Sequence, residues 1–412
     1  MKVGILGYGK EGQSAEKYFQ KHGANVQVFD KFTLSEVQAQ DFSDFDLILR
    51  SPSVHPRLDW TSSTRYFFDR CPCPIIGVTG TKGKGTTCSL IAALLKTLGQ
   101  STYLVGNIGN PAIDVLDELK TDDVVVYEMS SFQLWDLEKS PQISVILRID
   151  PDHLNVHDSF EDYVQAKANI CRYQTHKDCC IFYSNDSDSR TAAQYGNAKK
   201  IAYPITDDKE LDKILDSLSI PGRHNRDNTQ AALLAVSSFL RLDLHDFITK
   251  YKTQIITTFH NFQGLPHRLQ FVRELNGVQY YDDNFSSAFP ALDVALAAFP
   301  GQTIFLIAGG QDRGMDHSPA RERIFSAAGL KKAFLIGETS RHLSKNVDTE
   351  RCQLCASLPE ALNSARQAAE IEAKIHPETP VVILMSPGAP SFDMFKNFAD
   401  RGDQFQTLVK EI

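Results

Sequence analysis

The chain has 412 residues, of which 42% are hydrophobic and 23% are charged, and its formal net charge is -8. This composition is that of a globular protein of two or three domains, and the acidic balance argues against broad, non-specific binding of nucleic acid. We expect a cytoplasmic protein without membrane insertion, because no apolar run has the length of a bilayer crossing and the N-terminal residues do not resemble a signal peptide. The eight cysteines are thinly spread, which favours reduced thiols over a disulfide framework or a zinc site.

The first block of the chain has the strand–helix–strand pattern of dinucleotide-binding folds. A predicted strand over 2–6 leads into Gly7-Tyr-Gly-Lys-Glu-Gly12, a helix over 13–22 follows, and a second strand ends at Asp30. Glycines at this G-x-G-x-x-G spacing, with an acidic residue about 20 positions further on, are typical of a nucleotide site. By itself the pattern leaves a nicotinamide-dependent oxidoreductase open.

The second block opens with a glycine-rich loop, Gly77-Val-Thr-Gly-Thr-Lys-Gly-Lys-Gly-Thr-Thr87, which lies between an apolar strand and a predicted helix over 88–98. Backbone N–H groups of such a loop, the helix dipole and the charge of Lys84 together form a cradle for an anion. The match to a P-loop is imperfect, because Gly85 stands where a magnesium-binding hydroxyl usually follows the lysine and Thr86 comes one residue late. We interpret the loop as a site for nucleotide phosphates; the alternative is a plain turn between packed elements.

Two later segments of this block could carry chemistry. A predicted strand over 123–128 ends in Glu128, and a carboxylate at the C-terminal edge of a parallel strand can hold magnesium near a triphosphate or pair with a neighbouring lysine. The strand over 143–149 runs into Asp150-Pro-Asp-His-Leu-Asn-Val-His157, whose side chains suit either a metal site or plain turn chemistry. Lys167 follows on a predicted helix, where a lone lysine usually faces solvent.

A third block starts near Gly264-Leu-Pro-His-Arg268. Predicted strands cover 269–273, 278–282, 303–308, 332–336 and 380–385, with helices between them. Arg268 suits a phosphate through its bidentate fork, and an aspartate in Tyr281-Asp-Asp-Asn284 suits a ribose hydroxyl pair. The alternation of strands and helices along the whole chain predicts an α/β protein with parallel or mixed sheets.

Taken together, these segments resemble the Mur ligase family over essentially the whole chain and in the family's order. The segments that carry the resemblance are the P-loop over 80–86, Glu128-Met-Ser-Ser-Phe-Gln-Leu134, Asp152-His153, Tyr163-Val-Gln-Ala-Lys167, Gly222-Arg-His-Asn-Arg-Asp-Asn228, Gly264-Leu-Pro-His-Arg268 and Ser391-Phe-Asp-Met-Phe-Lys-Asn-Phe-Ala-Asp-Arg-Gly402. The last two resemble the branch of the family that adds D-glutamate.

The resemblance implies three α/β domains. They are a Rossmann-like N-terminal domain over 1–71 that binds a UDP-linked substrate, a central P-loop ATPase-like domain over 72–263, and a C-terminal Rossmann-like domain over 264–412 that binds the amino acid. It also implies an ATP-dependent amide ligase in peptidoglycan precursor synthesis, which uses ATP and two magnesium ions, acts on UDP-N-acetylmuramoyl-L-alanine and D-glutamate through an acyl phosphate, and is expected to be a monomer.

The resemblance further implies roles for single residues. The implied catalytic residues are Lys84, Glu128, His153, Lys167, His267 and Arg268. The implied metal ligands are Thr86, Glu128, His153 and a carbamate on Lys167. ATP would contact Gly80, Thr81, Lys82, Gly83, Lys84, Gly85, Thr86, Asn225, Asn228, Arg268 and Asp283. The UDP-linked substrate would contact Gly9, Glu11, Gly12, Asp30, Ser51, Asn107, Ser130 and Gln133. D-glutamate would contact Arg313, Ser391 and Phe398.

Four residues depart from the family's pattern. Gly85 lacks the P-loop hydroxyl, Phe285 and Arg313 stand where lysines are usual, and Ala288 replaces a polar residue. Because these changes cluster around the amino-acid site, a ligase for a different amino acid is the nearest alternative. A folylpolyglutamate synthase resembles only the second and third blocks, an oxidoreductase leaves the P-loop without purpose, and a catalytically inactive binding protein stays open because of Gly85 and Phe285.

Overall fold

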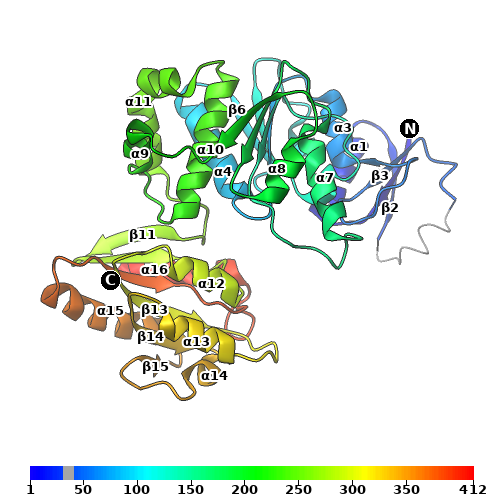
Figure 1. Ribbon diagram of the computed structural model, residues 1–412. Coiled ribbons are helices and arrows are strands. Elements are labelled where there is room, and N and C mark those ends of the chain that lie inside the picture. The colour runs from blue at the N-terminus through cyan, green and yellow to red at the C-terminus, as the bar shows by residue number, and fades with distance from the viewer. Residues whose placement is uncertain (31–40) are drawn as a thin grey trace. The chain divides into compact units, whose positions relative to one another are not determined.

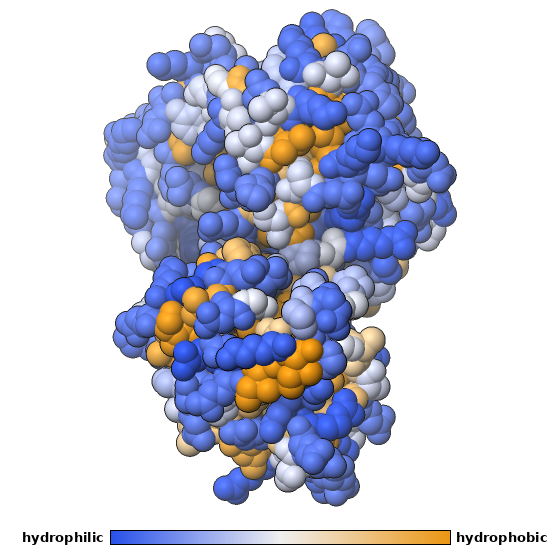
Figure 2. Space-filling model, turned by 90° about the vertical axis from the view of Figure 1, so that its left-hand side faces the viewer, coloured by the Kyte–Doolittle hydropathy of each residue, from blue (hydrophilic) through white to orange (hydrophobic). Residues whose placement is uncertain are grey.

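The computed structural model describes residues 1–30 and 41–412, and within them lie three β-sheets with helices packed against them (Figure 1). The strands are mostly parallel, which confirms the predicted α/β class. Among the described helices, none combines the length and the apolar character that a membrane crossing requires. Hydrophilic side chains cover most of the face shown in Figure 2, with apolar residues gathered in patches.

The first sheet has the strand order β2-β1-β3-β4, and all of its pairs are parallel. Its elements are β1 (Lys2–Leu6), α1 (Lys10–Lys21), β2 (Asn25–Phe29), β3 (Leu47–Arg50), β4 (Thr61–Ser62) and α3 (Ser63–Arg70). The apolar residues of β1 and β3 pack against Ala15 and Phe19 of α1, which makes the core of this sheet.

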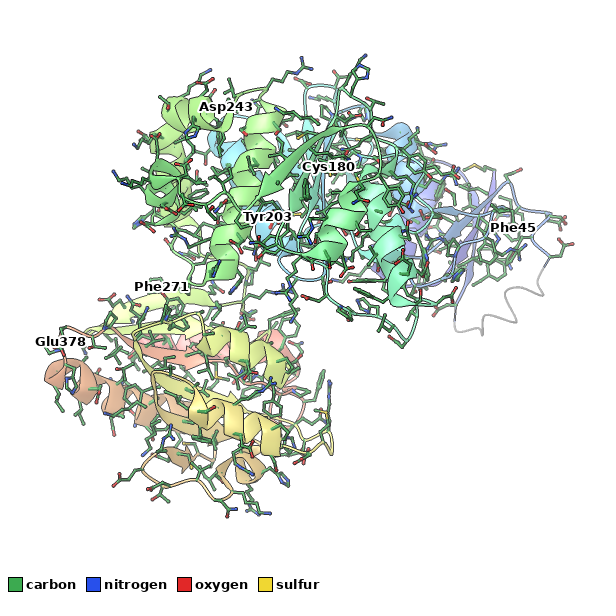
Figure 3. The ribbon with its side chains drawn as sticks, in the orientation of Figure 1. Phe45, Cys180, Tyr203, Asp243, Phe271 and Glu378 are labelled. Carbon is green, nitrogen blue, oxygen red and sulfur yellow. The ribbon has the colours of Figure 1, made fainter. Side chains whose placement is uncertain are left out.

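The second sheet has the order β10-β9-β8-β5-β7-β6. Its strands are β5 (Ile75–Thr79), β6 (Thr102–Gly106), β7 (Val124–Glu128), β8 (Ile143–Ile146), β9 (Cys179–Tyr183) and β10 (Lys199–Tyr203). Its helices are α4 (Lys84–Thr97), α5 (Ala112–Val115), α6 (Ser131–Leu134), α7 (Phe160–Arg172), α8 (Ser187–Ala193), α9 (Lys209–Leu215), α10 (Arg223–Phe239) and α11 (Leu244–Asn261). Every residue of β5 and β7 is buried, as expected for inner parallel strands. The edge strands β6 and β10 were not predicted, because edge strands lack a continuous apolar run. Cys180 on β9 and Tyr203 on β10 mark the β10 edge of the sheet (Figure 3).

The third sheet has the order β11-β12-β16-β13-β14-β15, in which only the β11–β12 hairpin is antiparallel among the described pairs. Its strands are β11 (Gln270–Leu275), β12 (Val278–Asp282), β13 (Thr303–Gly309), β14 (Leu330–Ile336), β15 (Cys352–Leu354) and β16 (Val381–Met385). Its helices are α12 (Phe289–Leu296), α13 (Ser318–Ser326), α14 (Ser340–Ser344), α15 (Leu358–Ile375) and α16 (Phe398–Glu411). The five predicted strands are present, and the short edge strand β15 was missed.

The chain forms two compact units. One comprises Met1–Ser217 with His224–Phe259 and holds the first and second sheets; the other comprises Leu218–Arg223 with His260–Ile412 and holds the third. The domain ranges 1–71, 72–263 and 264–412 stay a prediction.

Candidate active site

The glycine-rich loop connects the C-terminal end of β5 to the N-terminus of α4. Gly83 caps the helix with a left-handed φ of +88° and without a side-chain hydrogen bond. A Cβ atom on Gly83 would lie 2.5 Å from Asn228 Oδ1 on α10, so both the backbone conformation and the space require glycine here. The structure therefore brings Asn228 against the loop, and Asn225 lies buried one turn before it on the same helix.

Two lysine ammonium groups meet at this loop. Lys84 Nζ donates to the carbonyl oxygens of Gly80 and Thr81, each at 3.0 Å, and Lys167 Nζ on α7 donates to the same Gly80 oxygen, also at 3.0 Å. Lys167 is 1% exposed, so the alternative that it faces solvent is wrong. Burial, reinforced by the charge of Lys84, holds the pKa of Lys167 well below its usual value. A buried amine with a lowered pKa gives up its proton more easily, and the neutral amine is a nucleophile.

Glu128 ends β7, directly beside β5, and is 8% exposed. Burial raises the pKa of the Cys88 thiol on α4, the charge of Glu128 raises it further, and the charge of Lys84 lowers it. Glu128 and Lys84 therefore both lie close enough to one buried thiol to change its pKa. Because β8, β5 and β7 are parallel neighbours, their C-terminal ends lie side by side at one edge of the sheet.

The loop after β8 carries His153, which is exposed and has a φ of +55°. Its backbone N–H donates to Asp152 Oδ1 at 2.9 Å, and its ring lies 5.0 Å from the ring of Phe132. The Asp152 carboxylate is close enough to Lys167 to raise the pKa of its amine. The segment predicted to hold metal is thus next to the buried lysine.

His157 is a residue whose placement sequence reasoning missed, because it had been assigned to turn chemistry. Its ring is buried, with Nδ1 2.7 Å from Asp162 Oδ2 and Nε2 2.9 Å from Ser131 Oγ, and it stacks on Phe132. The ring joins α7 to α6 and so supports the loop that carries His153. Asp162, five residues further on at the start of a predicted helix, was the only signal for this contact in the sequence.

Several of the residues predicted for the UDP-linked substrate lie around the turn between β1 and α1. A Cβ atom on Gly12 would lie 2.2 Å from the Gly7 carbonyl oxygen, which also accepts a 2.7 Å hydrogen bond from Ser51 Oγ. Gly9 is exposed with open space around it, and Asp30 Oδ1 accepts from the backbone N–H of Tyr8 at 3.1 Å. The turn therefore requires glycine at position 12, and it leaves open space at Gly9.

Glu11 links this turn to the second sheet. Its Oε1 accepts a 2.6 Å hydrogen bond from Gln133 Nε2, and Gln133 in turn forms the capping box of α6 with Ser130. Buried Oε2 finds no hydrogen-bond partner among the described residues. Burial raises the pKa of Glu11 to about 7, against the lowering effects of Gln133 and Arg50. Asn107, by contrast, is exposed after β6, and its backbone N–H reaches the Glu128 carbonyl oxygen at 3.4 Å.

In the second compact unit, the predicted residues lie where β11 and β12 meet. His267 Nδ1 is 2.7 Å from Asp282 Oδ2, and this hydrogen bond raises the pKa of His267. Asp283 is buried, which raises its pKa to about 6, and its carboxylate accepts from Leu269 N, Ser286 Oγ and Ser386 Oγ. A ribose contact with Asp283 would have to replace or share one of these bonds.

The residues predicted for D-glutamate follow β13 and β16. Arg313 is exposed, Phe398 is 38% exposed at the start of α16, and Ser391 is buried with an Oγ that lacks a partner among the described residues. Sequence reasoning missed Arg401, which is fully buried and donates to Asn284 and to the carbonyl oxygens of the loops after β13 and β16. It fixes the loops that carry the three predicted residues.

Known proteins resemble this chain over its middle part and over its whole length. The family model for the Mur ligase middle domain matches residues 78–236. A UDP-N-acetylmuramoylalanine–D-glutamate ligase of Acetivibrio thermocellus is 33% identical, with 100% of this chain and 96% of that protein covered. The chain belongs to the Mur ligase family. A ligase of the same name from Clostridium kluyveri is 31% identical, with 100% and 97% covered.

Solved structures show the Mur ligase fold. A UDP-N-acetylmuramate–alanine ligase of Thermotoga maritima has a TM-score of 0.58 at 16% identity, with 100% of this chain and 99% of that chain covered. The folylpolyglutamate synthase of Mycobacterium tuberculosis has a TM-score of 0.55 at 12% identity, with 84% and 94% covered. At these identities the likeness concerns the fold alone.

Proposed function

We propose that this Mur ligase joins D-glutamate to UDP-N-acetylmuramoyl-L-alanine with the conversion of ATP to ADP and phosphate, as a step of peptidoglycan precursor synthesis. The observation that carries the proposal is the similarity to D-glutamate ligases over the whole chain, at 33% and 31% identity. We further propose that the enzyme acts in the cytoplasm and as a monomer.

The reaction brings together two anions. The substrate carboxylate attacks the γ-phosphorus of ATP, and the bond to the β,γ-bridging oxygen breaks to give ADP and an acyl phosphate. The amine of D-glutamate then attacks the acyl carbon, loses a proton, and displaces phosphate to form the amide. Repulsion between the carboxylate and the triphosphate dominates the first step, so positive charge held in place before the reaction contributes most of the catalysis.

The residues around the P-loop suit this task. We assign the phosphates of ATP to the loop over 80–86, where Lys84 exchanges its carbonyl contacts for phosphate oxygens, and the adenine side to Asn225 and Asn228. Asn228 already lies against Gly83, which supports that assignment. Arg268 is assigned to the γ-phosphate, with His267 close by, and Asp283 to the ribose.

The carboxylate, hydroxyl and carbamate oxygens among the assigned ligands suit magnesium. A hard cation takes oxygen ligands and, beside phosphates, needs only one or two from the protein; among the described residues, no three His, Cys, Asp or Glu side chains lie close enough to share one ion. Glu128 and Thr86 would hold one ion, and His153 and a carbamate on Lys167 would hold a second. When bound, the ions would neutralise phosphate oxygens. The Lys167 amine forms the carbamate by attacking CO2 and losing a proton, which its burial and depressed pKa favour.

The remaining contacts define the two other substrates. We assign the UDP moiety to the turn of Gly9, Glu11 and Gly12 together with Asp30. We assign further contacts with this substrate to Ser51, Asn107, Ser130 and Gln133. We assign D-glutamate to Arg313, Ser391 and Phe398. Among the described residues the buried Oγ of Ser391 has no hydrogen-bond partner, which supports a polar ligand at that position.

One assay tests the proposed function. Phosphate release is measured with ATP, magnesium and UDP-N-acetylmuramoyl-L-alanine, against a panel of D- and L-amino acids. Release that depends on D-glutamate is the expected result. Release with another amino acid only would leave the ligase chemistry in place and overturn the substrate, which Phe285, Ala288 and Arg313 make the leading alternative. No release with any amino acid would indicate a binding protein.

A further inference from the structure

An aromatic ring supports the arginine that we assign to the γ-phosphate. The guanidinium carbon of Arg268 lies 3.6 Å from the centroid of the Phe285 ring. Phe285 is 44% exposed, a high value for an aromatic side chain in a structured loop, so burial of its ring does not explain its position. The Phe285 ring meets the Phe398 ring edge-to-face at 5.2 Å, and Phe398 lies 6.3 Å from the His267 ring.

The backbone fixes the two partners in register. Phe285 N–H donates to the His267 carbonyl oxygen at 2.9 Å, and Leu269 N–H donates to Asp283 Oδ1 at 3.1 Å. These bonds tie the residues on both sides of Arg268 to the loop that carries Phe285. His267 and Leu269 have φ values of +59° and +43°, so a tight, unusual turn presents the Arg268 side chain to this loop.

We propose that Phe285 is a positioning residue, which holds the Arg268 guanidinium over its ring and couples it to Phe398, a residue that we assign to D-glutamate. This inference rests on the proposed function. A guanidinium that lies over a ring uses its face for the ring, and its in-plane N–H donors point past the edge, where a phosphate can compete for two of them. A lysine at position 285, as is usual in the family, has no ring on which the Arg268 guanidinium can lie.

The stack also joins two residues that we assign to different steps of the reaction. Arg268 acts on the phosphoryl group in the first step, and Phe398 contacts the amino acid that enters in the second. Because Phe285 touches both side chains, a loose ring at this position should disturb the transition state more than the binding of the UDP-linked substrate, whose contacts we place on other residues.

The test uses the full chain with Phe285→Leu and Phe285→Tyr. Phe325→Leu is the control, because the Arg351 guanidinium carbon lies 5.7 Å from the centroid of the Phe325 ring, in the same compact unit and among residues that we assign to no substrate. We expect Phe285→Leu to lower kcat about five-fold with an unchanged KM for the UDP-linked substrate, and Phe285→Tyr to keep the parent kcat. Wild-type kcat in Phe285→Leu would overturn the proposal.

Two readouts do not depend on turnover. In the nucleotide-free protein, the NMR signals of the Arg268 side chain, assigned with Arg268→Lys, should show an upfield ring-current shift that Phe285→Leu removes and Phe285→Tyr keeps. In calorimetry, Phe285→Leu should weaken the binding of a non-hydrolysable ATP analogue more than the binding of ADP, because only the analogue carries a γ-phosphate. If the enzyme proves inactive with D-glutamate, these measurements still decide the role of Phe285. An unshifted Arg268 signal in the parent protein would refute it.

Discussion

The buried carboxyl of Glu11 should make the stability of this protein depend on pH in a defined direction. Glu11 has one hydrogen bond, from Gln133, and a buried oxygen without a partner among the described residues. We expect Glu11→Gln to stabilise the compact unit that holds it at alkaline pH, because the substitution removes a charge that folding buries.

The magnitude follows from the two pKa values. The folded protein holds the Glu11 proton up to a pH of about 7, whereas the unfolded chain releases it near 4.5. Between these values the folded state binds more protons, so the free energy of unfolding falls as the pH rises, and above 7 the full cost is present. A shift from 4.5 to about 7 corresponds to about 3 kcal/mol as an upper bound. The variant should therefore gain up to that amount at pH 8 and nothing below pH 4.5.

Intrinsic fluorescence gives a selective measurement. The chain has two tryptophans, Trp60 and Trp135, and both lie in the unit that contains Glu11. Urea unfolding followed by their emission at pH 5, 6, 7 and 8 should show the gain of Glu11→Gln growing with pH. Glu118→Gln, which changes an exposed carboxylate, serves as the control. A difference between Glu11→Gln and the parent that stays flat from pH 5 to 8 would refute the reasoning.

Three further perturbations follow from the same structure. Arg50→Met removes the ion-pair partner of Asp136, whose carboxylate lies 2.5 Å from the fully buried guanidinium. The substitution should lower the free energy of unfolding by about 3–5 kcal/mol in the same fluorescence experiment, and a loss below about 1 kcal/mol would contradict a buried ion pair. Gly83→Ala places a Cβ atom 2.5 Å from Asn228 Oδ1, on a residue whose φ is left-handed. Calorimetry should therefore show that ATP binds at least about ten-fold more weakly, and an unchanged Kd would contradict the assignment of this loop to the phosphates of ATP. Lys167→Ala should abolish phosphate release, with partial recovery in concentrated acetate or formate, and a wild-type rate in this variant would eliminate the carbamate.

Much of the fold could be predicted because its signals are local. Inner strands such as β5 and β16 are continuous apolar runs, and the P-loop consists of a strand, a glycine-rich turn and a helix that are adjacent in the chain. The edge strands were not predicted, because they lack such local signals. β6, β10 and β15 are short or partly exposed, so their hydrophobic pattern is weak and their pairing depends on a partner strand elsewhere in the chain.

The sequence by itself determined the family, the α/β class and the identity of the candidate residues, because motifs record side chains at fixed separations along one strand, loop or helix. Only the tertiary structure decided that Lys167 is buried on the carbonyl oxygen of Gly80, that Glu11 meets Gln133, and that Phe285 supports Arg268. The first two contacts join residues 87 and 122 positions apart. Such contacts depend on which strands neighbour each other in a sheet and on how helices pack across it, and the order β8-β5-β7 is not written in the spacing of any motif.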